Sequence, residues 1–182
     1  MPRIQPLTLE NAPETTKPAL EGIHKAIGMV PNLLSTLGHS PAALSFYTHG
    51  KEALGKGTLG QVFGEQLAMA IGAASGCDYC VAAHNAIGKN AGLSDIERTA
   101  NIAGKSGDPK VQSAIDFAKA IVEGRGFVED SAFETVKAAG YTDDEVLEIL
   151  AITMFNLFTN YANHMIDTEI DFPKVEAGVS AG

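Results

Sequence analysis

The two cysteines of the chain are three residues apart, in Cys77-Asp78-Tyr79-Cys80, and a histidine follows at His84. Two cysteines at this spacing on a helix can form a disulfide across one helical turn. Because His84 is four residues beyond Cys80, its imidazole can contact the Cys80 thiol and take its proton. Cys77 would begin the helix, where unpaired backbone N–H groups favour a thiolate. The residue types and their spacing therefore indicate dithiol–disulfide redox chemistry.

The composition is that of an ordinary globular protein without a basic surface. Of 182 residues, 45% are hydrophobic and 19% charged, which predicts one folded domain over residues 1–182 that needs no metal or cross-link for stability. The net charge of −9, with no basic run, argues against nucleic acid or an anionic membrane as a partner. We expect a cytoplasmic protein, because neither a signal peptide nor a membrane span is visible. A close cysteine pair in that compartment is more often catalytic or metal-binding than structural.

Helix-start and helix-stop signals predict an all-α protein of about eight helices, with the cysteine pair at the start of a central one. Capping-box spacing, proline at the first helical position and stop glycines mark the helix ends. These signals are Thr58…Gln61, Ser94…Glu97, Ser131…Glu134, Thr142…Glu145, Ser40-Pro41, Asp108-Pro109, Gly55, Gly92 and Gly140. The expected helices span residues 13–27, 41–54, 60–75, 78–91, 94–104, 109–123, 131–139 and 143–167. Segment 28–39 should be a helical turn with a loop, and no segment alternates as a strand does.

Apolar periodicity predicts the buried face of the last helix and a tail beyond it. Residues at helical spacing form a core stripe in the last expected helix. They are Val146, Leu147, Leu150, Met154, Leu157 and Phe158. The tail, residues 172–182, is small and polar, and could pack on a neighbouring subunit or remain mobile.

Glu65, on the helix before the cysteines, is the third candidate for the site. It lies at the edge of a face made of small residues, which would let another helix approach closely. That face consists of Gly64, Ala68, Gly72 and Ser75. If the cysteine helix packs there, Glu65 could orient the His84 ring and stabilise its imidazolium. Glutamate, histidine and cysteine would then form a proton relay.

The whole spacing, Glu65-x11-Cys77-x2-Cys80-x3-His84, resembles the signature of the AhpD-like alkylhydroperoxidases, within the carboxymuconolactone decarboxylase superfamily. The motif core covers residues 60–92, and segment 156–173 resembles the peroxidase-related branch. The resemblance implies an all-helical fold, a homo-oligomer (trimer or hexamer) and no bound cofactor. It also implies a peroxidase that reduces a hydroperoxide substrate and is recycled by an external dithiol reductant, meaning a thiol, lipoyl-type or peroxiredoxin-type partner.

The resemblance also implies a role for each residue of the motif. Glu65 and His84 match the proton relay, Cys80 the cysteine that the relay activates, and Cys77 a more exposed exchange cysteine. Tyr79 stands where the best-studied members carry a histidine, and a phenol with a pKa near 10 is a poor proton shuttle at neutral pH. Tyr79 could line the site or pack against its surroundings.

Several alternatives remain open. The cysteines could be buried and inert, or they could bind zinc together with His84 and Glu65. The chain could be a lactone decarboxylase of the same superfamily that uses no sulfur chemistry. It could also be a non-catalytic redox sensor in which disulfide closure alters a subunit interface.

A polar face on the last helix also allows two interpretations. Asn160, Asn163, His164 and Asp167 share that face. They could line a pocket or a subunit interface, or they could form only a hydrogen-bonded helix face.

Overall fold

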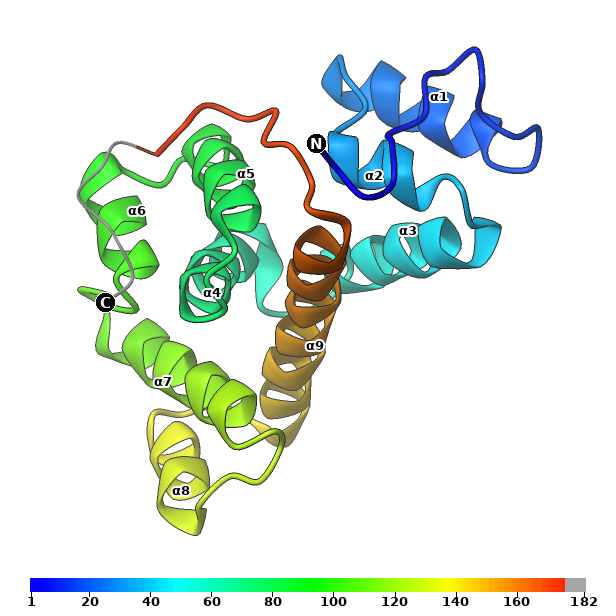
Figure 1. Cartoon of the computed structure of the whole chain (residues 1–182). Helices are drawn as coiled ribbons and strands as arrows, with labels where there is room; N and C mark the ends of the chain where they lie inside the picture. Colours follow the sequence, from blue (N-terminus) through cyan, green and yellow to red (C-terminus); the bar gives the residue numbers. More distant parts are fainter. Residues whose placement is uncertain (176–182) are drawn as a thin grey trace.

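The structure, a computed structural model that describes residues 1–175, consists in that part of nine α-helices without a strand (Figure 1). The helices are α1 Lys17–Ile27, α2 Asn32–Leu37, α3 Pro41–Gly55, α4 Gly60–Ala74, α5 Asp78–Asn90, α6 Asp95–Ile102, α7 Pro109–Glu123, α8 Asp130–Ala138 and α9 Asp143–Ile166. The all-α prediction is confirmed, and the turn expected in 28–39 is helix α2. From residue 176 on, the predicted tail lies outside the described residues. No described helix is long and apolar enough to cross a membrane.

Helix α9 is the long element along which the other helices are arranged (Figure 1). Its first half packs with α4, α7 and α8 in one hydrophobic cluster, which includes Leu67, Ile115 and Ile149. Its second half packs with α1, α2, α3 and α5 in another cluster, which contains Cys77 and Cys80. The candidate site therefore lies where the N-terminal helices close over the end of α9.

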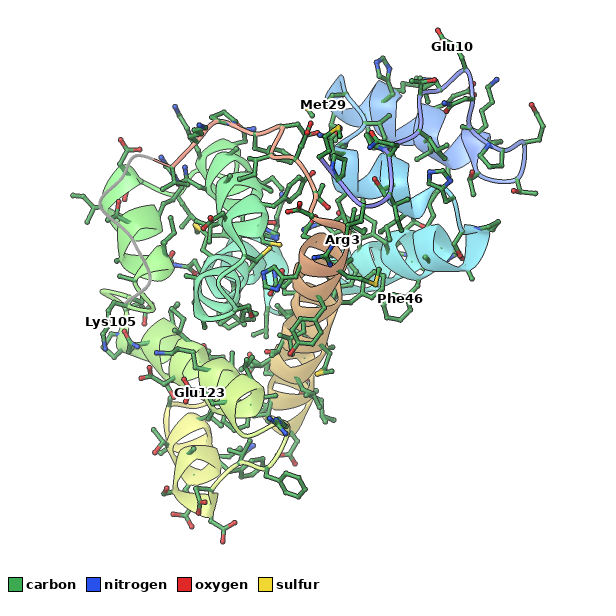
Figure 2. All side chains as sticks on the ribbon, viewed as in Figure 1. Arg3, Glu10, Met29, Phe46, Lys105 and Glu123 are labelled. Atoms are coloured by element: carbon green, nitrogen blue, oxygen red, sulfur yellow. The ribbon has the colours of Figure 1, made fainter. Side chains whose placement is uncertain are left out.

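Arg3 fixes the start of the chain to the end of α9 (Figure 2). Its backbone N–H donates to the Ile166 carbonyl oxygen at 2.7 Å, and its guanidinium donates to the Met165 carbonyl oxygen at 3.0 Å. The last carbonyls of a helix lack partners within the helix, and a cation there also interacts favourably with the helix dipole. The N-terminal segment is thus held over the same end of the molecule as the cysteines.

Most helix ends follow the local signals, and two expected signals are wrong. The confirmed ones are the capping boxes at Ser94 and Thr142, the N-caps Ser40 and Asp108, the positive-φ glycines Gly92 and Gly140, and the stop at Gly55, where α3 ends. Thr58 is not a cap, because Glu148 of α9 accepts its N–H and that of Leu59 at 2.8 and 3.1 Å. Ser131 is not a cap either, because it lies inside α8. At Thr58, the carboxylate of a distant residue, Glu148, takes the place of a local helix cap.

Helix α9 buries only part of the core stripe that its sequence predicts. Val146 and Leu157 are buried as expected, but Leu147, Leu150 and Met154 are 64%, 38% and 52% exposed. The other buried residues of the helix are Ile149, Ile152, Thr153, Asn156, Thr159, Asn160, Ala162, Asn163 and Ile166. Polar residues can face inward here because several bond to their own helix: Thr153 Oγ1 donates to the Ile149 carbonyl oxygen at 2.8 Å. The second half of α9 thus carries amide side chains into the interior.

An apolar stripe is left on the outside of α9. It is formed by Leu147, Leu150, Met154, Tyr161 and Met165, all exposed. Phe46 of α3 extends it; its labelled ring lies on the outer surface (Figure 2), with its centroid 4.8 Å from that of Phe158. A surface helix normally has the opposite arrangement, with polar residues outside.

Candidate active site

The turn between α4 and α5 sets the position of both cysteines. Gly76 has a φ of +64°, a left-handed conformation that glycine adopts without steric penalty. The N–H of Cys77 then donates to the Gly72 carbonyl oxygen at 2.9 Å. A Cβ added at Gly72 would lie 3.4 Å from Cys80 Cβ, so the small residue allows α5 to pack closely on α4. The small-residue face predicted on α4 is therefore confirmed at Gly72.

The two sulfur atoms are adjacent and enclosed. The Cys77 thiol donates a hydrogen bond to Cys80 Sγ at 2.7 Å, and Asn163 Nδ2 of α9 donates to the same sulfur at 3.2 Å. Both cysteines are free and only 2% exposed. The prediction that Cys77 is the more exposed cysteine is wrong, because helices α1 to α3 and the end of α9 pack around the pair.

The pKa values of the two thiols move in opposite directions. The hydrogen bond from Cys77 lowers the pKa of Cys80 to about 6, against the effect of burial. The charge of His84 and the amides of Asn160 and Asn163 lower it further. The hydrogen bond that Cys77 donates, together with burial, raises its own pKa. Of the two cysteines, Cys80 is therefore the one whose thiolate is favoured.

The expected activation of Cys77 by the helix N-terminus is thus wrong. Cys77 is the N-cap residue of α5, but its side chain makes no capping hydrogen bond to that helix. Its sulfur faces Cys80 instead. The favourable position at the helix start is outweighed by the neighbouring negative charge and by burial.

Glu65 and His84 form the predicted contact. His84 Nδ1 lies 2.6 Å from Glu65 Oε2, and Glu65 is only 2% exposed. On the other oxygen, Lys51 Nζ of α3 lies 3.5 Å from Glu65 Oε1. Burial acts to raise the pKa of Glu65, but the charge and hydrogen bond of His84, with those of Lys51, lower it overall. An ionised Glu65 holds a proton on Nδ1 and leaves Nε2 as the nitrogen for proton exchange.

Tyr79 is buried, and its hydroxyl group is hydrogen-bonded to α2. The hydroxyl oxygen accepts the Leu33 N–H at 3.3 Å, and its ring packs edge-on against Phe172 with centroids 5.6 Å apart. Burial, with a further contribution from the Asp171 carboxylate, raises the pKa of Tyr79 against the opposing effect of the Leu33 N–H. Tyr79 therefore joins α5 to α2 and to the C-terminal segment; its role as a site-lining residue stays a prediction.

The sequence analysis missed two residues of α3 that face Glu65. Lys51 contacts the carboxylate directly. Tyr47, one turn earlier, has its pKa raised to about 12 by burial and then by the charges of Glu65 and Cys80. Their i, i+4 spacing puts them on one helix face, but nothing in the sequence indicates which element that face meets.

The asparagines of α9 are placed inside the molecule. Asn160 and Asn163 are buried beside Cys80, and Asn163 is hydrogen-bonded to it. His164 of the same predicted group is exposed, and its Nε2 lies 3.3 Å from the Gly76 carbonyl oxygen.

Within residues 1–175, no group of three or more histidine, cysteine or acidic side chains is arranged to hold a metal ion. Glu65 and His84 are hydrogen-bonded to each other, and the Cys77 thiol is hydrogen-bonded to Cys80 Sγ. The zinc alternative therefore has no geometric support.

Both a protein family and several solved structures resemble this chain. The family model described as the carboxymuconolactone decarboxylase family matches residues 41–103, which include all four candidate residues. An uncharacterized peroxidase-related protein from Ralstonia eutropha JMP134, with the alkylhydroperoxidase AhpD core, has a TM-score of 0.84 and 26% identity over 93% of this chain and 92% of that chain. Residues 41–103 thus match the carboxymuconolactone decarboxylase family, and the fold of most of the chain is AhpD-like. This AhpD-like chain matched none of the curated proteins.

Two more distant structures have the same fold as this AhpD-like chain. A peroxidase-related protein from Silicibacter sp. TM1040 has a TM-score of 0.79 and 22% identity over 91% of each chain. A variant of the debrominase Bmp8, solved in complex with 2,3,4-tribromopyrrole, has a TM-score of 0.79 and 21% identity over 92% of this chain and 91% of that chain. The AhpD-like fold therefore occurs in proteins described by more than one activity.

Proposed function

We propose that this chain is a thiol-dependent peroxidase that reduces hydroperoxides through a Cys77/Cys80 dithiol–disulfide cycle. The observation that carries the proposal is the pair of adjacent sulfurs, with the Cys77 thiol hydrogen-bonded to Cys80 Sγ at 2.7 Å, which favours the thiolate at Cys80. The Glu65–His84 hydrogen bond of 2.6 Å supports a proton relay next to it. A nucleophile, its resolving partner and a proton donor thus lie together at one place.

In the first step the Cys80 thiolate attacks the distal oxygen of the hydroperoxide. A sulfur–oxygen bond forms, the oxygen–oxygen bond breaks, and Cys80 becomes a sulfenic acid. The alkoxide that leaves takes a proton from the His84 imidazolium, which Glu65 stabilises and orients. The peroxide is reduced by two electrons and the sulfur is oxidised by two.

In the second step Cys77 resolves the sulfenic acid. The Cys77 sulfur, losing its proton to the relay, attacks Cys80 and expels the hydroxyl oxygen, which leaves as water after protonation. The product is the Cys77–Cys80 disulfide. A dithiol of an external partner then attacks one sulfur, passes through a mixed disulfide and restores both thiols. Because both sulfurs are enclosed, the covering helices have to move for this partner to reach them.

The test is the loss of two thiols per chain on addition of one equivalent of organic hydroperoxide. We expect one disulfide by mass measurement, and turnover when a dithiol reductant is added. Cys80→Ser should abolish turnover and His84→Gln should lower it by about 100-fold, the usual contribution of a positioned general acid–base. His49→Gln, a change at an exposed histidine of α3, is the matched control. Full turnover in Cys80→Ser or His84→Gln would contradict the mechanism.

One observation favours a second candidate, a redox sensor without turnover. Both cysteines are 2% exposed, so a disulfide could form with a small oxidant and then resist an external reductant. The sensor predicts stoichiometric oxidation, a change of oligomer size and negligible turnover with any dithiol. A lactone decarboxylase would instead retain its activity when both cysteines are replaced by serine.

A further inference from the structure

We propose that Asn160 and Asn163 of α9 form the binding site for the peroxide group of a small hydroperoxide next to Cys80. This inference rests on the proposed peroxidase function and names the residues that touch the substrate. The observation behind it is a pair of buried amides whose hydrogen-bonding groups are left unpaired where the chemistry takes place.

The amide of Asn160 is completely buried, and its one polar interaction among the described residues is a weak one with Cys80. The residue is 0% exposed, and within residues 1–175 neither its Nδ2 nor its Oδ1 makes a hydrogen bond of ordinary geometry. Asn163 uses Nδ2 to hold Cys80 Sγ at 3.2 Å, while its Oδ1 has no partner in the same part of the chain. Buried polar side chains are nearly always paired, so such groups call for a ligand or another explanation.

Asn156, one turn earlier on the same helix, provides a contrast. It is also buried, but its Nδ2 donates to the Ile152 carbonyl oxygen at 2.8 Å. An asparagine at a buried position of α9 can therefore satisfy its donor on its own helix. On α9, the asparagines with unpaired amide atoms, Asn160 and Asn163, lie further along the helix than Asn156, where α9 meets the cysteine pair.

The unpaired groups lie within reach of the reacting sulfur. Asn163 is bonded to Cys80 directly. Asn160 is three residues before it, on the same face of α9, and its amide helps to lower the pKa of Cys80. A molecule that reacts with the Cys80 sulfur would therefore meet both side chains.

The donors and acceptors of these amides match those of a hydroperoxide. An alkyl hydroperoxide has one O–H donor and hydrogen peroxide has two, and two amide carbonyl oxygens, on Asn160 and Asn163, have no partner among the described residues. The substrate's proximal oxygen becomes an alkoxide as the oxygen–oxygen bond breaks, and the Asn160 Nδ2 group is a donor for that developing charge. Donors fixed where charge develops are usually the largest single contribution to such a step.

The surroundings restrict the size of the substrate. Cys77 and Cys80 belong to an apolar cluster with Leu33, Leu37 and Ala162 and are nearly inaccessible. Hydrogen peroxide and short-chain alkyl hydroperoxides fit this enclosure better than bulky aromatic or lipid hydroperoxides.

The experiment compares Asn160→Leu with Asn156→Leu, both made in the full chain. Oxidation of the reduced protein is followed in a single turnover with hydrogen peroxide, and separately with diamide, a thiol oxidant that has no hydroperoxide group. We expect Asn160→Leu to slow the peroxide reaction by about 100-fold, as for loss of one oxyanion donor, and the diamide reaction by only a few-fold. Asn156→Leu should leave the ratio of the two rates unchanged. With wild-type protein, cumene hydroperoxide should react more slowly than hydrogen peroxide.

Equal slowing by both oxidants in Asn160→Leu would overturn the inference, because Asn160 would then act only on the Cys80 thiolate. An unchanged peroxide rate would also overturn it. Should the leucine variant not fold, as judged by helical circular dichroism, Asn160→Ser removes the amide without adding apolar bulk, and the same loss is expected. If wild-type protein itself does not react with hydrogen peroxide but does react with diamide, the proposed function fails instead.

Discussion

The hydrogen bond from Cys77 to Cys80 can be tested with two substitutions that differ in one donor. Cys77→Ala removes the donor, whereas Cys77→Ser keeps a hydroxyl in its place. The bond is the largest cause of the low pKa of Cys80, about 6 compared with an ordinary value of 9.0. We therefore expect the pKa of Cys80 to rise in the alanine variant and to stay close to the wild-type value in the serine variant.

The size of the rise follows from the energy of one such bond. A hydrogen bond to a charged group contributes about 1.5–3 kcal/mol, and one pKa unit corresponds to about 1.4 kcal/mol. The alanine variant should therefore have a Cys80 pKa of roughly 7–8, one to two units above the wild type. At a pH near 6, the reactive thiolate fraction would fall by roughly 5- to 50-fold.

The measurement is the rate of alkylation by iodoacetamide as a function of pH, because only the thiolate reacts. Each variant retains one cysteine, so the titration belongs to Cys80 alone. The same pKa in the alanine and serine variants would refute the reasoning, as would an alanine variant that still titrates near 6.

The same low pKa makes the stability of the reduced protein depend on pH. The folded-state pKa of Cys80 lies below the unfolded value, so its thiolate contributes stability that is fully present above about 9 and is lost as the pH falls through about 6. Denaturant unfolding of reduced wild-type protein should show this increase between pH 6 and 9. The increase should be smaller in Cys77→Ala.

Three further predictions concern the residues around the site. Lys51→Met should raise the pKa of Glu65 and move acid unfolding to higher pH, since that carboxylate stabilises the fold only while it is ionised; the exposed Lys56→Met is the control, and equal shifts would contradict the role of Lys51. Tyr79→Phe should destabilise by about 1–2 kcal/mol in denaturant unfolding, because it leaves an N–H group of α2 without its acceptor; an unchanged midpoint would count against that bond. We expect a homo-oligomer that covers the outer stripe of α9, so Met154→Glu should reduce the mass measured by light scattering, and a monomeric wild type would disprove this.

The chemistry of the motif could be predicted because most of it is local. Cys77, Cys80 and His84 lie within three turns of α5 and its cap, so their spacing alone decides which side chains meet. Glu65 could be predicted as a further site residue because the small residues beside it indicated a close contact between two helices. That contact occurs at Gly72.

Two arguments from the sequence disagreed about which cysteine is the thiolate. The helix start favoured Cys77, whereas the resemblance made Cys80 the cysteine activated by His84. The hydrogen bond from Cys77 and the charge of His84, both local to α5 and its cap, decide in favour of Cys80. The long-range contacts, such as those of the α9 amides with Cys80 and of Lys51 with Glu65, leave no pattern in spacing.

Helix α9 shows why apolar periodicity failed at the residues that matter most. A core helix is recognised by its apolar stripe, but Leu147, Leu150 and Met154 of that stripe in α9 face outward while asparagines face inward. Folding alone does not favour this arrangement, because leucine at a buried position would contribute hydrophobic stabilisation that an unpaired amide does not. We propose that two demands outside the folding of one chain account for it together. The proposed sulfur chemistry would use amide donors and acceptors inside, and the expected second subunit would cover the apolar stripe outside. The Asn160→Leu and Met154→Glu variants separate these demands, since the first should change peroxide reactivity without dissociating the oligomer and the second should do the reverse.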